Sequence, residues 1–194
     1  MTPQRVRLVA IFAVILLSGL TLVAWTQVWF DIRLETGQSL PISGDVAAPA
    51  LTALALSGLA LAGALAIAGI VFRVILGILQ AAIGALVVTS AALALADPIT
   101  ASARSISAAT GVAGAQSIST LVSHVSASAW PLLSLSFGIL LVLLGLAIVA
   151  TARLWPSSSR KYQAVRLEQA DGDRSAAGDW DALSDGRDPT EASR

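Results

Sequence analysis

The amino-acid sequence predicts an all-α membrane protein: a four-transmembrane-helix bundle with both termini cytoplasmic and a disordered C-terminal tail. Composition is the first reason, because 56% of the 194 residues are hydrophobic and only 12% are charged, whereas soluble domains carry roughly 25% charged residues. Charge distribution is the second reason, because only nine of the Lys, Arg, Asp and Glu side chains precede Arg153. The residues before Arg153 therefore cannot make a soluble surface.

Long uncharged runs place the membrane helices. A helix needs about 20 apolar residues to cross roughly 30 Å of hydrocarbon, and four runs meet that length. We expect membrane helices at residues 8–28, 49–71, 76–96 and 131–153. The remaining segments are a cytoplasmic N-terminus (1–7), two outer loops (29–48 and 97–130), a cytoplasmic turn (72–75) and a polar cytoplasmic tail (154–194).

Arg73 marks the predicted turn between the second and third helices. Residues 49–96 are apolar apart from Arg73, and one straight helix of that length would measure about 72 Å at 1.5 Å per residue. That length exceeds twice the bilayer core, so the chain must turn back. A lone charge at mid-membrane costs several kcal/mol, so we place Arg73 in the turn of a tight helical hairpin.

The positive-inside rule predicts the orientation. With the N-terminus inside, the outer loops hold only Arg33 and Arg104. The cytoplasmic flanks hold six cations, namely Arg5, Arg7, Arg73, Arg153, Arg160 and Lys161. We therefore expect both termini in the cytoplasm, as an even number of spans requires.

Tryptophans lie at the predicted membrane boundaries. Indole rings prefer this interface because one edge is polar and the rest is apolar. We interpret Trp25, Trp29 and Trp130 as outer membrane-interface anchors and Trp155 as an inner one.

A cleaved signal peptide is the alternative for the first span. The flank MTPQRVR is suitably basic. The apolar run is longer than a typical signal-peptide core, however, and no A-x-A site follows it. We therefore expect the first span to be retained.

The predicted spans carry little chemistry. Apart from Arg153 at the cytoplasmic end of the last span, they contain no ionisable side chain, and none has a central proline. Proton relays and ion-coupled transporters usually bury ionisable groups in their spans, and transporters often have interrupted helices. We expect structural roles for Gln80 and for several hydroxyls that can bond to carbonyls of their own helix. These hydroxyls belong to Ser18, Thr52, Ser57, Thr89, Ser90 and Ser134.

Small residues recur four positions apart in the two middle spans. This spacing lets helix backbones approach closely in lipid, and it favours a compact bundle over a wide pore. The pairs are Gly58–Ala62, Ala62–Ala66, Gly77–Ala81 and Ala81–Ala85. Homo-oligomerisation stays open.

The outer loops are predicted to hold short elements. In the first loop, VWFDIRL is typical of a strand and TGQSLPISG of a turn. In the second, Ile118, Leu121, Val122 and Val125 follow helical spacing, which predicts a short amphipathic helix on the outer leaflet.

No residue pattern points to catalysis, a metal or a cofactor. The chain has no cysteine, and its only histidine, His124, has no acid or cysteine close by to share a metal. No Ser-His-Asp arrangement can be assembled, and no basic patch is large enough for nucleic acid. We therefore expect a protein that is not an enzyme and whose surroundings are the lipid bilayer.

The tail ends in a motif, GDWDALSDGRDPT at residues 178–190. Asp179 is suited to cap a short helix, Asp181 to its first turn and Gly186 to its end. Trp180 and Leu183 would then share one side, and so short a helix forms when its apolar residues find a groove. The motif is either a docking segment for a cytoplasmic protein or a solvated acidic tail.

Several stretches together resemble the tryptophan-associated transmembrane protein family. The tail WDALSDGRDPT is similar to the family's terminal signature, and LPISGDVAAPALTALALSGLALAGA to its second span. The fourth span opens with Trp130–Pro131 and closes with Trp155–Pro156, as in that family. The resemblance implies four spans in the plasma membrane of an actinobacterium and a genomic link to tryptophan biosynthesis. It implies no known activity and no established site residues.

Two functions remain in competition. The first is a non-catalytic membrane protein of unknown activity that presents the tail motif, with Trp180, Leu183, Asp179 and Asp181 as its docking residues. The alternative is a transporter or exporter component for tryptophan or a related aromatic compound, which the implied genomic context favours and the apolar spans disfavour.

Overall fold

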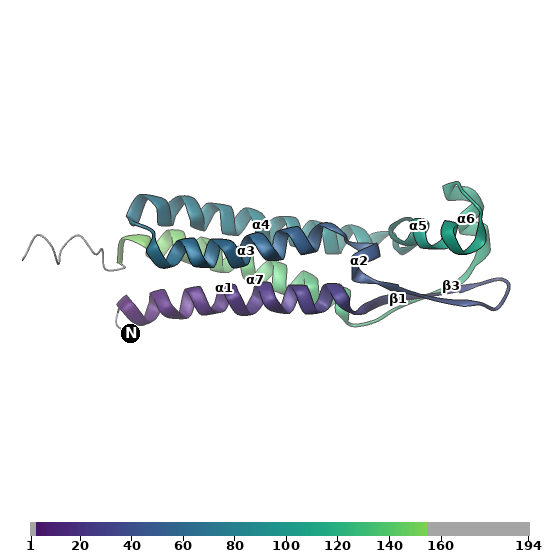
Figure 1. Ribbon diagram of the computed structural model, residues 1–194, viewed down its shortest axis with the longest axis horizontal. Coiled ribbons are helices and arrows are strands. Elements are labelled where there is room, and N and C mark those ends of the chain that lie inside the picture. Colours follow the sequence, from purple (N-terminus) through teal and green to yellow (C-terminus); the bar gives the residue numbers. More distant parts are fainter. Residues whose placement is uncertain (1–2, 155–194) are drawn as a thin grey trace, which may run out of the picture. The chain divides into compact units, whose positions relative to one another are not determined.

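Four long helices dominate the computed structural model, which describes residues 3–154 (Figure 1). They are α1 (Pro3–Thr26), α3 (Ala50–Ile67), α4 (Ile70–Ala96) and α7 (Trp130–Thr151). Each is long and apolar enough to cross a membrane. The predicted fold class, a mostly helical protein with four membrane-spanning helices, is confirmed.

The four helices form an up-and-down ring. α1 contacts α3 and α7, and α4 contacts the same two helices. Successive helices run in opposite directions, so every neighbouring pair is antiparallel (Figure 1). α1 and α4 therefore face each other across the interior of the ring.

Each helix turns one stripe of residues toward the bundle. On α4 the buried residues are Arg73, Gly77, Gln80, Gly84, Val87, Ala91 and Ala94. On α7 they are Pro131, Ser134, Gly138, Leu141, Gly145 and Ile148. Both stripes advance in alternating steps of three and four, the spacing with which helices pack at a shallow crossing angle in bundles.

The helical hairpin turns earlier than the sequence predicts. The chain reverses at Ala68 and Gly69, and α4 continues through residues 72–75, which were expected to form the turn. The backbone N–H of Arg73 already donates to the Gly69 carbonyl at 2.9 Å, and the Arg73 side chain is only 2% exposed. Arg73 therefore lies in the first turn of α4 and not in a loop, because the helical backbone already satisfies its own hydrogen bonds at this position.

A three-stranded sheet lies beyond one end of the ring. Its strands are β1 (Val28–Leu34), β2 (Ser39–Ser43) and β3 (Val122–Ala127), in the order β2-β1-β3 and antiparallel throughout. The strand expected at VWFDIRL is confirmed as β1. The pairing of β1 with β3 joins the two loops that connect the long helices at this end.

The second loop is more structured than the sequence predicts. It contains α5 (Pro98–Thr110), α6 (Ala115–Leu121) and β3. The expected amphipathic helix is present only as far as Leu121, because Val122 and Val125 lie in β3 and Val125 pairs with Ile32 of β1. Ile118 of α6 is 2% exposed and packs into a protein core. The prediction that this apolar face lies on the outer leaflet is therefore wrong.

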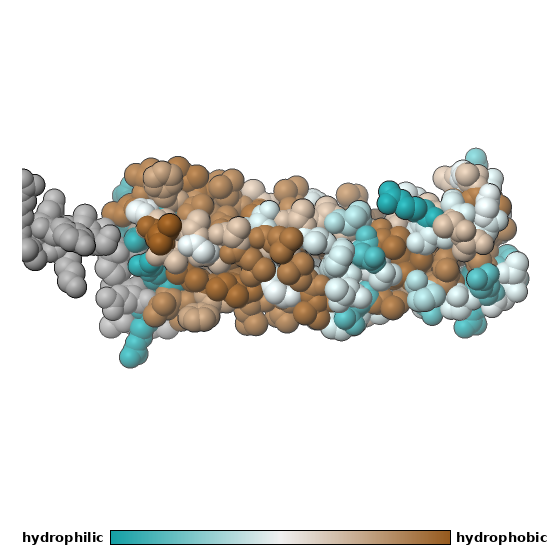
Figure 2. Space-filling view, in the orientation of Figure 1, coloured by the Kyte–Doolittle hydropathy of each residue, from teal (hydrophilic) through white to brown (hydrophobic). Residues whose placement is uncertain are grey.

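The two ends of the bundle differ in character. Hydrophobic side chains cover the four long helices, and hydrophilic ones are more frequent around the strands, α5 and α6 (Figure 2). We call the latter end the sheet end; it also carries the short helix α2 (Gly44–Ala47). We call the opposite end the arginine end, because Arg5, Arg7, Arg73 and Arg153 lie at or next to the helix ends there.

Candidate functional site

The sheet end has its own hydrophobic core. β1 turns Phe30, Ile32 and Leu34 inward, with exposed fractions of 0–3%, while Asp31 and Arg33 between them are exposed. This alternation is typical of a strand with one buried face. Ile106 of α5 and Ile118 of α6 close the core from the other side. Both connecting loops therefore fold as one packed unit.

Trp29 belongs to this core. Its side chain is 0% exposed, and its indole Nε1 donates to the Ala24 carbonyl at 2.8 Å. The interpretation of Trp29 as a membrane-interface anchor needs correction, because a fully buried indole does not reach the lipid boundary. Trp25 and Trp130 are half-buried against the same core, at the junction of the long helices and the sheet end.

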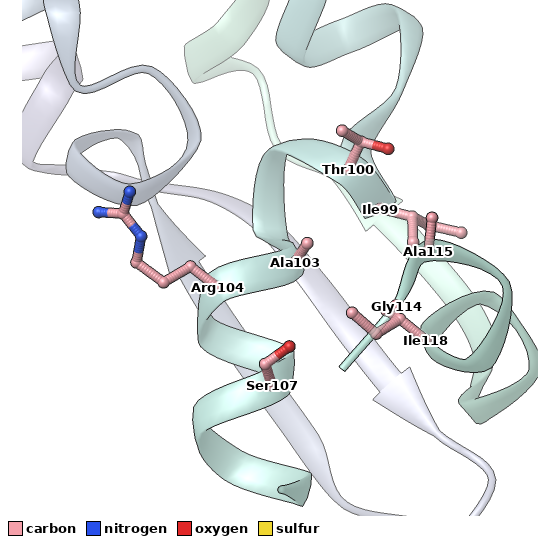
Figure 3. A pocket seen from close by; sticks show the side chains of 8 residues that line it. All are labelled: Ile99, Thr100, Ala103, Arg104, Ser107, Gly114, Ala115 and Ile118. Carbon is pink, nitrogen blue, oxygen red and sulfur yellow. The ribbon is translucent and has the colours of Figure 1, made fainter. Parts of the chain in front are cut away.

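A small cavity lies between α5 and α6 (Figure 3). Its volume is about 240 Å³, and Ile99, Ala103 and Ile118 contribute apolar walls. Figure 3 shows the Arg104 side chain extending from α5 away from Ala115 and Ile118. The cavity is smaller than most ligand pockets, which measure about 300–1,000 Å³, and its one charged side chain is not directed across it.

A wider groove of about 500 Å³ lies where α3, α4 and α5 meet at the sheet end. Half of its lining residues are alanines, and Asp97 is also among them. Asp97 caps α5 by accepting from the backbone N–H of Thr100 at 3.0 Å. Hydrogen bonds from Thr100 hold the pKa of Asp97 below its ordinary value, so this carboxylate is ionised at neutral pH.

Glycines bring α4 and α7 into backbone contact inside the bundle. A Cβ on Gly145 would lie 2.5 Å from the Ala81 nitrogen and 2.8 Å from the Gly77 oxygen. A Cβ on Gly84 would lie 2.5 Å from the Val142 nitrogen and 2.9 Å from the Gly138 oxygen. The sequence analysis expected Gly77 and Ala81 to lie at a helix contact, and both do. It also expected Ala85 there, but Ala85 is exposed and the neighbouring Gly84 makes the contact instead.

The bundle interior also contains buried polar side chains. Ser18, Thr21, Gln80 and Ser134 are each 0% exposed. Thr21 donates to the Leu17 carbonyl at 2.8 Å, and Ser57 and Thr89 likewise bond to carbonyls of their own helices, as expected.

Other buried polar atoms lack such partners. The hydroxyls of Ser18, Thr52 and Ser134 and both amide atoms of Gln80 make no hydrogen bond within the described residues. Gln80 was expected to be structural. The burial of its amide could not be predicted from the sequence, because it depends on which face of α4 turns inward.

The remaining predicted site residues fall elsewhere. Trp155 and the tail residues Asp179, Trp180, Asp181 and Leu183 lie outside the described residues. His124 is exposed on β3, opposite Arg33 of β1. Within residues 3–154 no group of three His, Cys, Asp or Glu side chains is close enough to hold a metal ion.

A comparison with known protein families gives a match to this chain. The model of the tryptophan-associated transmembrane protein family matches residues 8–190. The chain belongs to this family. The match covers all four long helices, the sheet end and most of the tail, which fits the membrane nature of the family. No curated protein and no solved structure matches the chain.

Proposed function

We propose that this member of the tryptophan-associated transmembrane family is a non-catalytic membrane protein that presents its C-terminal tail to a cytoplasmic protein. The observation that carries the proposal is the direction of α7, which brings the chain to the arginine end just before the tail begins. The docking residues would be Trp180 and Leu183, flanked by Asp179 and Asp181.

Charge supports a cytoplasmic location for that end. Within residues 3–154 the arginine end has four arginines and no carboxylate. The carboxylates of this part of the chain, Asp31, Glu35, Asp45 and Asp97, all lie at the sheet end. By the positive-inside rule the arginine end faces the cytoplasm of the bacterial cell.

The contact between α4 and α7 supports an anchoring role for the bundle. Backbones that touch at four glycines leave no space between these two helices for a passing solute. Close packing of this kind is the main source of stability for helices in lipid. The bundle would then hold the tail at the membrane surface, and homo-oligomers are compatible with this role.

Affinity purification after in-cell crosslinking tests the docking proposal. The Trp180→Ala, Leu183→Ala double variant would be compared with the unaltered protein at native expression level. A Val165→Ala, Leu167→Ala variant removes two apolar side chains from the same tail and serves as the matched control. A cytoplasmic partner that is lost only from the first variant supports docking, whereas identical partners for all three proteins contradict it.

Transport of tryptophan or a related aromatic compound is the second candidate. The observation that favours it is the buried polar side chains of α4, Gln80 and Arg73, since such residues often mark solute pathways in membrane proteins. Tryptophan uptake and efflux would be measured with the gene deleted and with Gln80→Leu. Unchanged flux in the deletion strain would remove this candidate.

A further inference from the structure

The groove where α3, α4 and α5 meet lies at the edge of the hydrocarbon layer. α3 has 18 residues, which measure about 27 Å at 1.5 Å per residue and span most of the roughly 30 Å hydrocarbon core. Ala50, the first residue of α3, lines the groove and is exposed. Leu93 of α4 also lines it and is 72% exposed. The groove therefore opens toward lipid at the level where the hydrocarbon meets the headgroups.

The groove also extends along α4 into the membrane. Asp97 lines it at the end of this helix, and Ser90 lines it seven residues earlier, roughly 10 Å away along the axis. The small side chains of its alanines leave a volume of about 500 Å³, which is within the about 300–1,000 Å³ of most ligand sites. An apolar groove that follows a membrane helix is suited to an acyl chain.

Asp97 gives this apolar groove a negative charge. Among the described residues that line the groove, Asp97 is the charged one, and its side chain is exposed. Hydrogen bonds from Thr100 and Ile99 lower its pKa, and no cation within residues 3–154 contributes to this shift. One carboxylate accepts several hydrogen bonds, so Asp97 can receive an ammonium group in addition to its bond from the Thr100 backbone N–H.

We propose that the groove binds one phospholipid with an ammonium headgroup, of the phosphatidylethanolamine type, from the leaflet at the sheet end. The ammonium pairs with Asp97, and one acyl chain lies along α4 toward Ser90. A second copy packed symmetrically over the groove is disfavoured, because it would bring two Asp97 carboxylates together and like charges repel. This lipid site is independent of tail docking and of transport.

Native mass spectrometry of the full-length protein in detergent measures the binding of added lipids. Phosphatidylethanolamine is compared with phosphatidylglycerol of identical acyl chains, because phosphatidylglycerol has no ammonium. We expect the first phosphatidylethanolamine to bind about two- to fivefold more tightly, as the contribution of a partly exposed ion pair allows. Equal affinities for the two lipids, or a preference for phosphatidylglycerol, overturn the proposal.

Asp97→Asn tests the role of the carboxylate. Asparagine caps a helix about as well as aspartate does, so α5 keeps its cap while the charge is lost. The preference for phosphatidylethanolamine should disappear in this variant. Asp31→Asn is the matched control, because it removes an exposed carboxylate of β1 that does not line the groove; it should retain the preference. A preference that survives Asp97→Asn overturns the site.

Ala50→Leu tests the groove itself. The larger side chain would occupy the groove from an exposed position, so the affinity for phosphatidylethanolamine should fall to that for phosphatidylglycerol. Ala60→Leu, at an exposed position of α3 outside the groove, is the matched control and should bind as the unaltered protein does. Unchanged lipid binding in Ala50→Leu overturns the proposal. A dimer of the unaltered protein that Ala50→Leu dissociates also overturns it, because a second copy would then occupy the groove.

Discussion

Gly44 occupies the point where the sheet end meets the bundle. A Cβ at this position would lie 2.6 Å from the Trp29 indole nitrogen and 2.7 Å from the Trp25 carbonyl oxygen. The first of these atoms belongs to a ring that is fully buried and hydrogen-bonded to Ala24, and the second to the backbone. Neither can move away easily, so only glycine lets β2 and α2 approach the end of α1.

Gly44→Ala is expected to destabilise the protein by about 1–3 kcal/mol, the usual cost of forcing an extra carbon into a packed site. The measurement is the midpoint of thermal unfolding in detergent, followed by tryptophan emission. Gly19→Ala is the control, because a Cβ at Gly19 meets nothing within 4 Å. An unfolding midpoint that is equal in the two variants would contradict the close packing at Gly44.

Arg7 and Arg73 show how charge is accommodated at the arginine end. The Arg7 guanidinium donates to the Ala66 carbonyl in the last turn of α3, where a helix has unpaired carbonyls and a partial negative charge. The Arg73 side chain is buried, and the positive charge of Arg7 repels it. Both cations therefore stay close to a helix end, as the cost of a charge deeper in lipid requires.

At the scale of elements, α4 and α7 form the closest helix pair. Gly77 and Gly84 on α4 are seven residues apart, as are Gly138 and Gly145 on α7. Because the helices are antiparallel, Gly77 meets Gly145 and Gly84 meets Gly138. These two glycine contacts are seven residues, or about two helical turns, apart. The close approach of the backbones gives the van der Waals packing on which helix association in lipid depends.

Gly145→Leu should push α4 and α7 apart and lower stability by about 1–3 kcal/mol or more, because the leucine side chain would meet the Ala81 and Gly77 backbones. Gly63→Leu is the matched control on an exposed helix face with nothing within 4 Å. Thermal unfolding in the same detergent compares them. Equal stability of the two leucine variants would mean that α4 and α7 are not in backbone contact.

The β1–β3 pairing is the element that joins the two loops. Asp31 and Ser126 are directly opposite in the antiparallel register, and both are exposed. Opposite residues in such a pair have Cα atoms about 4.5–5.5 Å apart, which is within the range that a disulfide spans.

Asp31→Cys combined with Ser126→Cys should form a disulfide under mild oxidation. The chain has no cysteine, so no other thiol competes. Formation is measured as a mobility shift that a reductant reverses. Glu35→Cys with Ser126→Cys is the out-of-register control and should remain largely reduced. Equal oxidation of both pairs would contradict the register, and no oxidation of either would contradict the sheet.

At the scale of the whole molecule, the asymmetry of charge implies a fixed orientation. The sheet end carries Asp31, Glu35, Asp45 and Asp97, and the opposite end carries four arginines. Cations next to short loops are retained in the cytoplasm during insertion. The folded sheet end would then face outward while the tail faces inward.

Cysteine labelling with a membrane-impermeant maleimide tests this orientation. Glu35→Cys, exposed beside the β1–β2 turn, should react in intact spheroplasts. Ser158→Cys, near the start of the tail, should react only after lysis. The reverse pattern would invert the topology and place the tail motif away from any cytoplasmic partner.

The membrane class, the four spans, the strand at residues 28–34 and the family could all be predicted from the amino-acid sequence. These features depend on composition, on apolar runs longer than the bilayer is thick, or on alternation within one segment, and all of them are local along the chain. The tail motif is equally local, and its docking role stays a prediction.

The contacts between distant segments became visible only in the folded structure. The pairing of β3 with β1, the burial of Trp29 beneath Gly44, the choice of Gly84 over Ala85 as the contact to α7, and the enclosure of Gln80 all depend on residues far apart in the sequence. In alanine-rich spans every helix face is apolar, so hydrophobic periodicity cannot reveal which face turns inward. Close packing of backbones makes that choice, because it requires glycines to coincide on two helices at one depth.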